Sequence, residues 1–258
     1  MKKIINNKKL KGIALIIISI ILFLSAILYS YNFQESKKLP NSVKNTIKEI
    51  KKKDYQPKDD NTTNKTEYIN ELPQLRETYG NNDILGKIEI PDLNINSLIT
   101  RTVNNLYYLN YNIHKQKDDI GNPFFDFRNK DLNNDRQINI YGHNTDNEKI
   151  VDKLPLINLE AYNDEYVFNN YKNVYLYLDE RKVTYKVIAV KIVNESDNEH
   201  MKLLFTNDED FENHVNKLLS GSKYNDNEKI NREDKLLVVQ ICHFNPKGTY
   251  LLIICKKK

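Results

Sequence analysis

The segment Leu236–Cys242 has the sequence Leu-Leu-Val-Val-Gln-Ile-Cys. A short apolar run that is rich in β-branched residues predicts a buried β-strand. Polar and turn-forming residues, His-Phe-Asn-Pro-Lys-Gly, follow the strand and lead to a second apolar run, Tyr250–Cys255. A cysteine at the end of a core strand that opens into a loop is held rigidly and is still reachable. Cys242 is therefore a candidate nucleophile.

Outward from this strand, alternating and apolar segments indicate a mainly β domain. The other predicted strands are Ile84–Ile90, Ile95–Thr102, Pro123–Phe127, Gln137–Tyr141, Val174–Leu178 and Val183–Val193. One clear amphipathic helix is predicted over Asn207–Leu219, with Asn207 or Asp208 as its N-cap. Seven or eight strands with few helices favour a closed or nearly closed β-barrel.

The N-terminal part predicts a membrane anchor. Residues 1–11 carry five lysines and no acidic residue, and residues 12–31 carry no charge. Twenty helical residues span roughly 30 Å, the thickness of a bilayer core. The lysines orient the N-terminus towards the cytoplasm and everything after residue 31 towards the outside. We expect an uncleaved anchor rather than a signal peptide, because the apolar run is long and Ser25-Ala26 is a poor cleavage site.

Residues 32–81 are polar and predict an extracellular linker between the anchor and a domain over residues 82–258. The spacing of Leu39, Val43, Ile47 and Ile50 within this linker predicts a marginal amphipathic helix. Residues 51–66 are charged and rich in asparagine, which is typical of a flexible linker.

Composition excludes several classes of protein. The chain has 258 residues, 40% of them hydrophobic, and a net charge of +4 with acidic and basic residues interleaved. This distribution predicts no nucleic-acid partner. Only two cysteines are present, so the chain is not a disulfide scaffold. We predict a core thiol at Cys255, because hairpin geometry places it roughly 20 Å from Cys242, beyond bridging distance. No phosphate loop or zinc-type spacing occurs, and we predict no metal or cofactor.

A cysteine nucleophile needs a nearby base or cation. His143 is the favoured partner because it closes a predicted strand, follows Gly142 and precedes polar residues. His243 is a rival base, although successive side chains on a strand point to opposite faces. The alternative is that Cys242 is a buried structural thiol. The remaining histidines, His114, His200 and His214, are interpreted as surface or structural residues.

Several segments carry a resemblance to a known family. Asn139-Ile140-Tyr141-Gly142-His143-Asn144 closely matches the catalytic histidine motif of the sortases. The segments Asp83–Pro91 and Gly121–Lys130 are similar to the first strand and to a class B segment of that family. The chain from about residue 83 to the C-terminus thus resembles the sortases, and class B most. The resemblance implies an eight-stranded β-barrel that acts as a cysteine transpeptidase.

The resemblance also implies a reaction, partners and a location. Cys242 would cleave a C-terminal sorting signal of a surface protein through a thioacyl intermediate, with His143 as the proton carrier. The acceptor would be an amine of the peptidoglycan cross-bridge or of its lipid-linked precursor. The enzyme would be a single-pass membrane protein with an extracellular catalytic domain. No cofactor is implied.

Two residues depart from the family pattern. Ile241 stands where the family has Thr, and Tyr250 stands where it has an Arg that binds substrate and stabilises the oxyanion. A tyrosine donates a single neutral hydrogen bond and lacks the charge and the fork of a guanidinium. Lys247, Arg101 and Arg128 are left as other sources of a cation. A catalytically impaired binding or assembly module and a hydrolytic cysteine peptidase therefore remain alternative functions.

Overall fold

The computed structural model describes residues 17–27, 39–52 and 68–258, in two units divided between Lys38 and Leu39. In the first unit, residues 17–27 form a helix. The predicted lysine tail 1–11, the rest of the predicted span 12–31 and most of the predicted flexible linker lie outside the described residues. Across the three described ranges, every helix is too short or too polar to traverse a bilayer.

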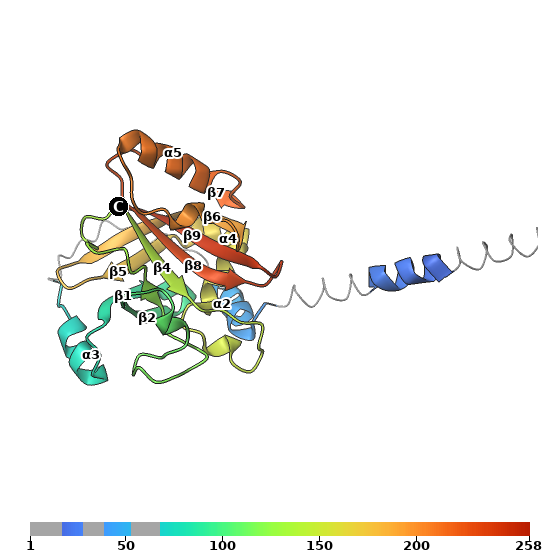
Figure 1. Ribbon diagram of the computed structural model, residues 1–258, viewed down its shortest axis with the longest axis horizontal. Helices are drawn as coiled ribbons and strands as arrows, with labels where there is room; N and C mark the ends of the chain where they lie inside the picture. The colour runs from blue at the N-terminus through green and yellow to red at the C-terminus, as the bar shows by residue number, and fades with distance from the viewer. Residues whose placement is uncertain (1–16, 28–38, 53–67) are drawn as a thin grey trace, which may run out of the picture. The chain divides into compact units, whose positions relative to one another are not determined.

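The second unit contains a closed barrel of eight strands (Figure 1). The strands are β1 (Ile84–Ile90), β2 (Ile95–Thr100), β3 (Phe124–Phe125), β4 (Gln137–Gly142), β5 (Asn173–Tyr177), β6 (Lys182–Asn194), β8 (Leu236–His243) and β9 (Thr249–Lys257). They are paired in the order β5-β1-β2-β3-β4-β8-β9-β6, and β6 pairs with β5 to close the ring. The two-residue β7 (Tyr224–Asn225) adds to β6 outside the ring. The predicted eight-stranded barrel is confirmed.

Alternation along β8 fills both faces of the barrel wall. Leu237, Val239 and Ile241 are fully buried in the main core inside the barrel. Leu236 and Val238 face outward into a second apolar cluster. Because both faces of this strand are covered, its sequence is an almost continuous apolar run rather than an alternating one.

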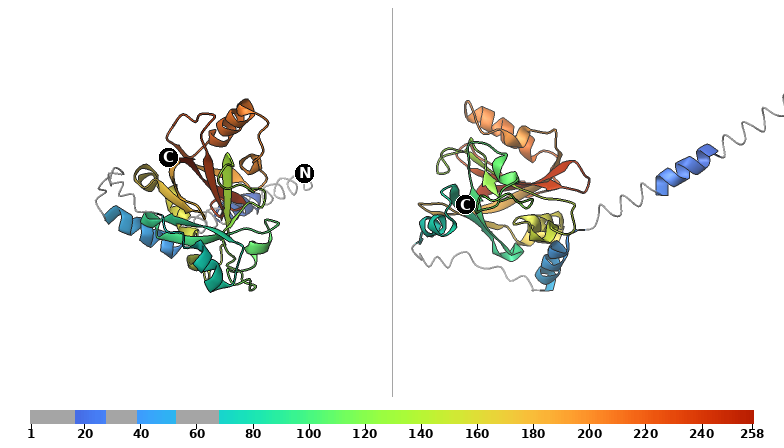
Figure 2. Two further views of the ribbon diagram at one scale, coloured as in Figure 1. Left: turned by 90° about the vertical axis from the view of Figure 1, so that its left-hand side faces the viewer. Right: turned by 60° about the horizontal axis from the view of Figure 1, so that its bottom comes forward.

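Helix α5 (Asp208–Leu219) supplies the cover for the outer face. Asn207 caps its N-terminus by accepting a hydrogen bond from the backbone N–H of Asp210. Its apolar stripe, Phe211, Val215 and Leu218, packs on the outward side chains of β6, β8 and β9. Figures 1 and 2 show α5 lying across that side of the barrel.

Helix α2 (Asn41–Lys52) is part of the barrel unit. Its Val43 and Ile50 are buried in the main core, and the helix contacts the 3₁₀ segment η4 (Ile157–Asn163). The compact unit therefore begins at Leu39, whereas the sequence pattern predicted its start near residue 82. The amphipathic spacing correctly indicated the helix. Its docking on the barrel, which the linker prediction did not include, results from tertiary packing.

The remaining helical segments are short and join the strands. They are η1 (Pro91–Leu93), η2 (Tyr107–Leu109), η3 (Val151–Lys153), η5 (Glu199–Met201), α3 (Leu72–Tyr79) and α4 (Glu165–Asn170). Helix α3 ends at Gly80, whose φ of 58° is left-handed and suits glycine. The predicted strand Pro123–Phe127 is shorter than expected, because the chain turns at Asp126, whose carbonyl accepts from the N–H of Asn129.

Candidate active site

The register of β4 and β8 brings the two sequence-predicted residues together. These strands pair in parallel, and the last rung joins Gly142 to Ile241. His143 and Cys242 are the next residue on each strand. Neighbouring strands lie about 4.8 Å apart, so His143 and Cys242 stand at adjacent strand ends. We call these two residues the candidate pair. Among the described residues, the structure records no hydrogen bond between the imidazole and the thiol. Such bonds are often loose before substrate binds.

The glycine before His143 is required by packing. A Cβ atom at Gly142 would lie 2.8 Å from Cδ1 of Leu156 and 3.1 Å from Cγ2 of Ile241. Both contacts are too close for any larger residue without a shift of the core. Gly142 therefore lets the Leu156 side chain pack against β4 immediately before His143.

Cys242 faces the outer side of the barrel. Its neighbour Ile241 is fully buried in the interior core, and the thiol, one residue on, is half-buried on the opposite face. Tyr250 lies directly across from Cys242 in the β8–β9 ladder and packs against the outer apolar cluster. The position at which the sequence departs from the family pattern is thus next to the thiol.

The rival base and the second cysteine lie elsewhere. The His243 ring is buried and contacts Glu160 Oε1 at 2.8 Å through Nδ1 and the carbonyl of Asn245 at 2.6 Å through Nε2. It is therefore held away from the thiol, as strand alternation predicts. Cys255 is fully buried in the core, and both cysteines are free.

The environment keeps both candidate groups neutral. Burial raises the pKa of the Cys242 thiol, and the Glu195 carboxylate raises it further, while backbone N–H groups, including that of Asn144, oppose the shift. Burial lowers the pKa of His143 below its ordinary value, with the Asp119 carboxylate in partial opposition. The predominant pair near pH 7 is a thiol and a neutral imidazole, which suits proton transfer from sulfur to nitrogen during attack.

The cations considered as substitutes for the family arginine bind other groups. Arg101 donates to the carbonyl of Asn129. Arg128 forms a two-bond ion pair with Asp126. Lys247 pairs with Asp146 in an exposed contact of 2.8 Å. These three cations are thus engaged with other groups, and Tyr250 is the residue that lies opposite Cys242.

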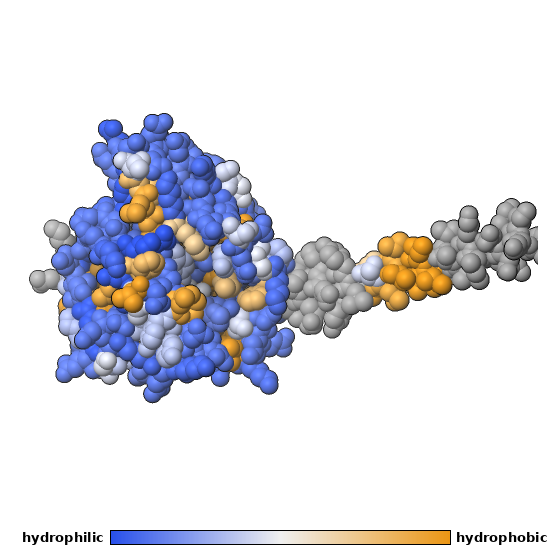
Figure 3. Space-filling model, viewed as in Figure 1, coloured by the Kyte–Doolittle hydropathy of each residue, from blue (hydrophilic) through white to orange (hydrophobic). Residues whose placement is uncertain are grey.

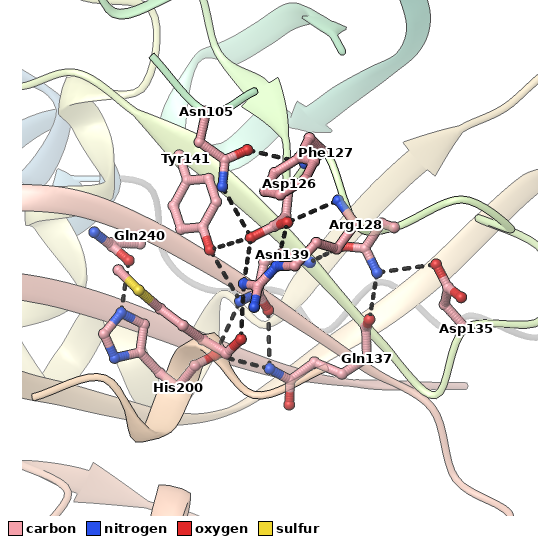
Figure 4. Close-up of polar contacts among 12 residues, drawn as sticks. Asn105, Asp126, Phe127, Arg128, Asp135, Gln137, Asn139, Tyr141, His200 and Gln240 are labelled. Carbon is pink, nitrogen blue, oxygen red and sulfur yellow. Dashed lines mark hydrogen bonds and ion pairs between the residues drawn. The ribbon is translucent and has the colours of Figure 1, made fainter. Parts of the chain in front are cut away.

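A polar network covers the outer face next to the candidate pair (Figure 4). Asp126 is fully buried and accepts from Tyr141 Oη at 2.8 Å and from Arg128 Nε and Nη2 at 2.9 and 2.7 Å. Hydrogen bonds from Arg128 and Tyr141 hold the pKa of Asp126 below its ordinary value although burial alone would raise it. Arg128 also donates to the carbonyl of Met201, which ties η5 to this face.

His200 lies at the centre of the same network. Its ring contacts Gln240 Oε1 at 2.7 Å, and its carbonyl accepts from Gln137 and Asn139 at 2.9 Å each. The ring centroid lies 6.0 Å from that of Tyr250 in an edge-on arrangement. The network therefore extends along the sheet to the residue that faces the thiol.

His200 and His214, which were predicted to be surface or structural residues, are structural and not on the surface. Both side chains are about 1% exposed. His214 on α5 contacts Glu199 Oε1 at 3.0 Å and Gln137 Oε1 at 2.8 Å. Their burial was not evident from the sequence, because the residues that precede them in the chain are mostly polar.

Exposed apolar side chains stand on the loops around the network. Asn105 in the loop after β2 donates to Asp126, and its neighbours Val103 and Leu106 are 83% and 70% exposed. Leu204, which follows η5, is 83% exposed. Figure 3 shows separate apolar patches on an otherwise hydrophilic face of the barrel unit. Within residues 17–27, 39–52 and 68–258, no cluster of His, Cys, Asp or Glu is placed to hold a metal.

Comparisons with known proteins point to one family. No family model matches the chain. It is 28% identical over 193 residues to sortase B of Listeria monocytogenes, with 72% of each chain covered. The crystal structure of Clostridium perfringens sortase B superposes with a TM-score of 0.65 and 27% identity, covering 72% of this chain and 98% of that one. The chain is similar to the class B sortases in sequence and in fold. A Staphylococcus aureus sortase B–substrate complex shares the fold, with a TM-score of 0.64, 20% identity and coverage of 74% and 87%.

Similarity to this family supports a cysteine transpeptidase. Sequence patterns indicated the histidine, the cysteine and the unusual Tyr250 of this chain. They assigned no role to Asn144, although it belongs to the histidine motif, and none to Glu160. Both are buried beneath the candidate pair. The adjacency of Asn144 to His143 was the available signal, whereas Glu160 lies in a long connection that has no diagnostic pattern.

Proposed function

We propose that this sortase cleaves a C-terminal sorting signal of surface proteins at Cys242 and transfers the protein to an amine of the cell wall. The observation that carries this proposal is the parallel register that places His143 and Cys242 at adjacent strand ends. The acceptor would be an amine of the peptidoglycan cross-bridge or of a lipid-linked precursor.

In the first step, the Cys242 sulfur attacks the carbonyl carbon of the sorting-signal threonine, and His143 takes the thiol proton. The carbon–nitrogen bond then breaks, and His143 gives the proton to the leaving amine. The product is a thioester on Cys242. Tyr250 is the candidate hydrogen-bond donor to the developing oxyanion, because it lies across the ladder from Cys242.

In the second step, the acceptor amine attacks the thioester carbonyl and passes a proton to His143. The carbon–sulfur bond breaks, an amide forms, and the proton returns to sulfur. The thioester keeps the acyl group activated, so the outcome depends on whether an amine or water arrives first.

The location that fits this chemistry is the outer face of the membrane. The uncharged run over residues 12–31, with lysines before it, supports a single-pass anchor with the N-terminus in the cytoplasm. The barrel unit would then stand outside, where sorting signals and cell-wall amines are found.

The proposal is tested by incubating the protein with peptides of the Asn-Pro-x-Thr type and analysing it by intact-mass spectrometry. We expect an acyl adduct on Cys242 that an added amine removes to yield an amide, and no adduct on Cys242→Ala. If folded wild-type protein forms no adduct with any peptide of this type, the proposal fails. If an adduct forms but water alone releases it at the same rate with and without amine, the enzyme is a hydrolase.

One observation favours an impaired enzyme that acts as a binding or assembly module: Tyr250 occupies the position at which the resemblance implies an arginine. We expect Tyr250→Arg to raise the acylation rate by about 10²-fold, since one oxyanion donor contributes roughly 2.7–4 kcal/mol. Tyr250→Phe removes only the hydroxyl and should lower the residual rate. If the wild type turns over rapidly and neither variant changes its rate, position 250 has no part in the site.

A further inference from the structure

We infer that Asn144 and Glu160 are positioning residues that hold the ends of β4 and β8 together so that His143 reaches Cys242. This inference rests on the proposed catalytic pair. It adds a buried side-chain link beneath the reacting groups, on the face of the sheet opposite to the polar network.

The ladder between β4 and β8 stops one residue before the pair. Its last rung joins Gly142 to Ile241, whereas β8 stays paired with β9 through Cys242 and His243. The chain after Gly142 has no β4–β8 ladder bond, and a strand end of this kind frays at little cost in free energy. The Asn144 side chain replaces the missing rung, because its Nδ2 donates to the carbonyl oxygen of Cys242 at 2.7 Å.

Glu160 fixes the orientation of that amide. The carboxylate comes from η4 and is 4% exposed, and Asn144 is 5% exposed. Asn144 Nδ2 lies 3.3 Å from Glu160 Oε1, and Asn144 Oδ1 accepts from the backbone N–H of Thr145 at 2.7 Å. Both ends of the side-chain amide are therefore engaged, and the amide cannot flip without losing its three hydrogen bonds.

His243 ties Glu160 to β8. Its Nδ1 contacts Glu160 Oε1 at 2.8 Å, and Asn163 Nδ2 donates to the other carboxylate oxygen at 2.9 Å. Glu160 therefore contacts His243, which directly follows Cys242, and Asn144, which directly follows His143. The link joins the two strand ends behind the candidate pair.

The test is a double-mutant cycle on thiol reactivity, which needs no sorting-signal substrate. The full-length protein in detergent is treated with iodoacetamide at pH 7, and peptide mapping follows modification at Cys242. We expect His143→Ala to slow alkylation by about tenfold or more, since the imidazole no longer accepts the thiol proton. Asn144→Ala should slow alkylation by most of the same factor. The double variant should be no slower than His143→Ala, which gives a coupling of about fivefold or more.

Asn158→Ala is the matched control. Asn158 also lies on η4, and its Nδ2 donates to the carbonyl of Leu93 at 2.9 Å, so the substitution removes a comparable amide–carbonyl bond. We expect Asn158→Ala to alkylate at Cys242 as fast as the wild type. Glu160→Ala should alkylate nearly as slowly as His143→Ala. If Asn144→Ala behaves like Asn158→Ala, the inference fails while the catalytic pair stands. If His143→Ala alkylates as fast as the wild type, the catalytic pair itself fails and the inference with it.

A second measurement uses the wild type and does not depend on whether a variant folds. The side-chain amide protons of Asn144 should exchange with solvent at least about tenfold more slowly than those of Asn147, which is exposed three residues later. Equal exchange rates would show that the amide is not engaged and would overturn the inference.

Discussion

Replacing His143 with alanine is expected to slow thioacyl formation at pH 7 by about 10²- to 10⁴-fold, the usual contribution of a positioned acid–base group. The effect is large because burial raises the pKa of Cys242, so little thiolate is present without a base. The measurement is the pre-steady-state rate of adduct formation by quenched-flow mass spectrometry. His114→Ala, which removes an exposed histidine, is the control and should react like the wild type.

The pH dependence of the same reaction gives a second signature of His143. Because burial lowers the pKa of His143, the imidazole is protonated and unable to accept a proton only below its ordinary value of about 6.5. The wild-type rate should therefore fall on the acid side with a midpoint below that value and stay flat through neutral pH. The acid limb should be absent in His143→Ala. An unchanged acid limb in that variant would assign it to another group.

Replacing Asp126 with alanine is expected to lower the free energy of unfolding by about 1–3 kcal/mol, the usual cost of leaving a buried hydrogen-bonding group without its partner. Asp126 is fully buried, and its loss leaves the hydroxyl of Tyr141 and the side chains of Arg128 and Asn105 without their acceptor. The measurement is urea denaturation. Asp146→Ala removes an exposed ion pair with Lys247 and should change stability by less than about 1 kcal/mol. Equal effects of the two substitutions would contradict the prediction.

This stabilisation should depend on pH with a definite sign. Hydrogen bonds hold the folded-state pKa of Asp126 below that of the unfolded chain, in spite of the opposing effect of burial. Its ionised form therefore contributes stability above the unfolded pKa of about 3.9, and this contribution disappears as the pH falls through the folded-state pKa. The difference between wild type and Asp126→Ala should thus be full at neutral pH and narrow in acid.

Local patterns were sufficient to find the reactive residues and most of the strands. Leu236–Cys242 is apolar and β-branched, so its strand forms in almost any context that buries it. Cys242 ends this segment and His143 follows another strand, and their chemistry is evident from residue type. The helix over Asn207–Leu219 was likewise predicted by its spacing and cap, since these depend on neighbours three or four residues away.

What surrounds those residues was decided by contacts between segments that are distant in the sequence. The adjacency of His143 and Cys242 depends on the parallel pairing of β4 with β8. Glu160 reaches His243 from 83 residues away, and no periodicity announces a single buried carboxylate. Polar side chains such as His200 are buried only because several strands and η5 satisfy them together.

The sequence by itself therefore determined a mainly β chain with a thiol and an imidazole at two strand ends, because short-range spacing and residue chemistry encode these features. The tertiary structure decided that the two ends lie side by side, that Tyr250 faces the thiol across the ladder and that Asn144 bridges the strands behind it. Barrel closure sets these relations, since strand order and register depend on the packing of the whole core rather than on any one segment.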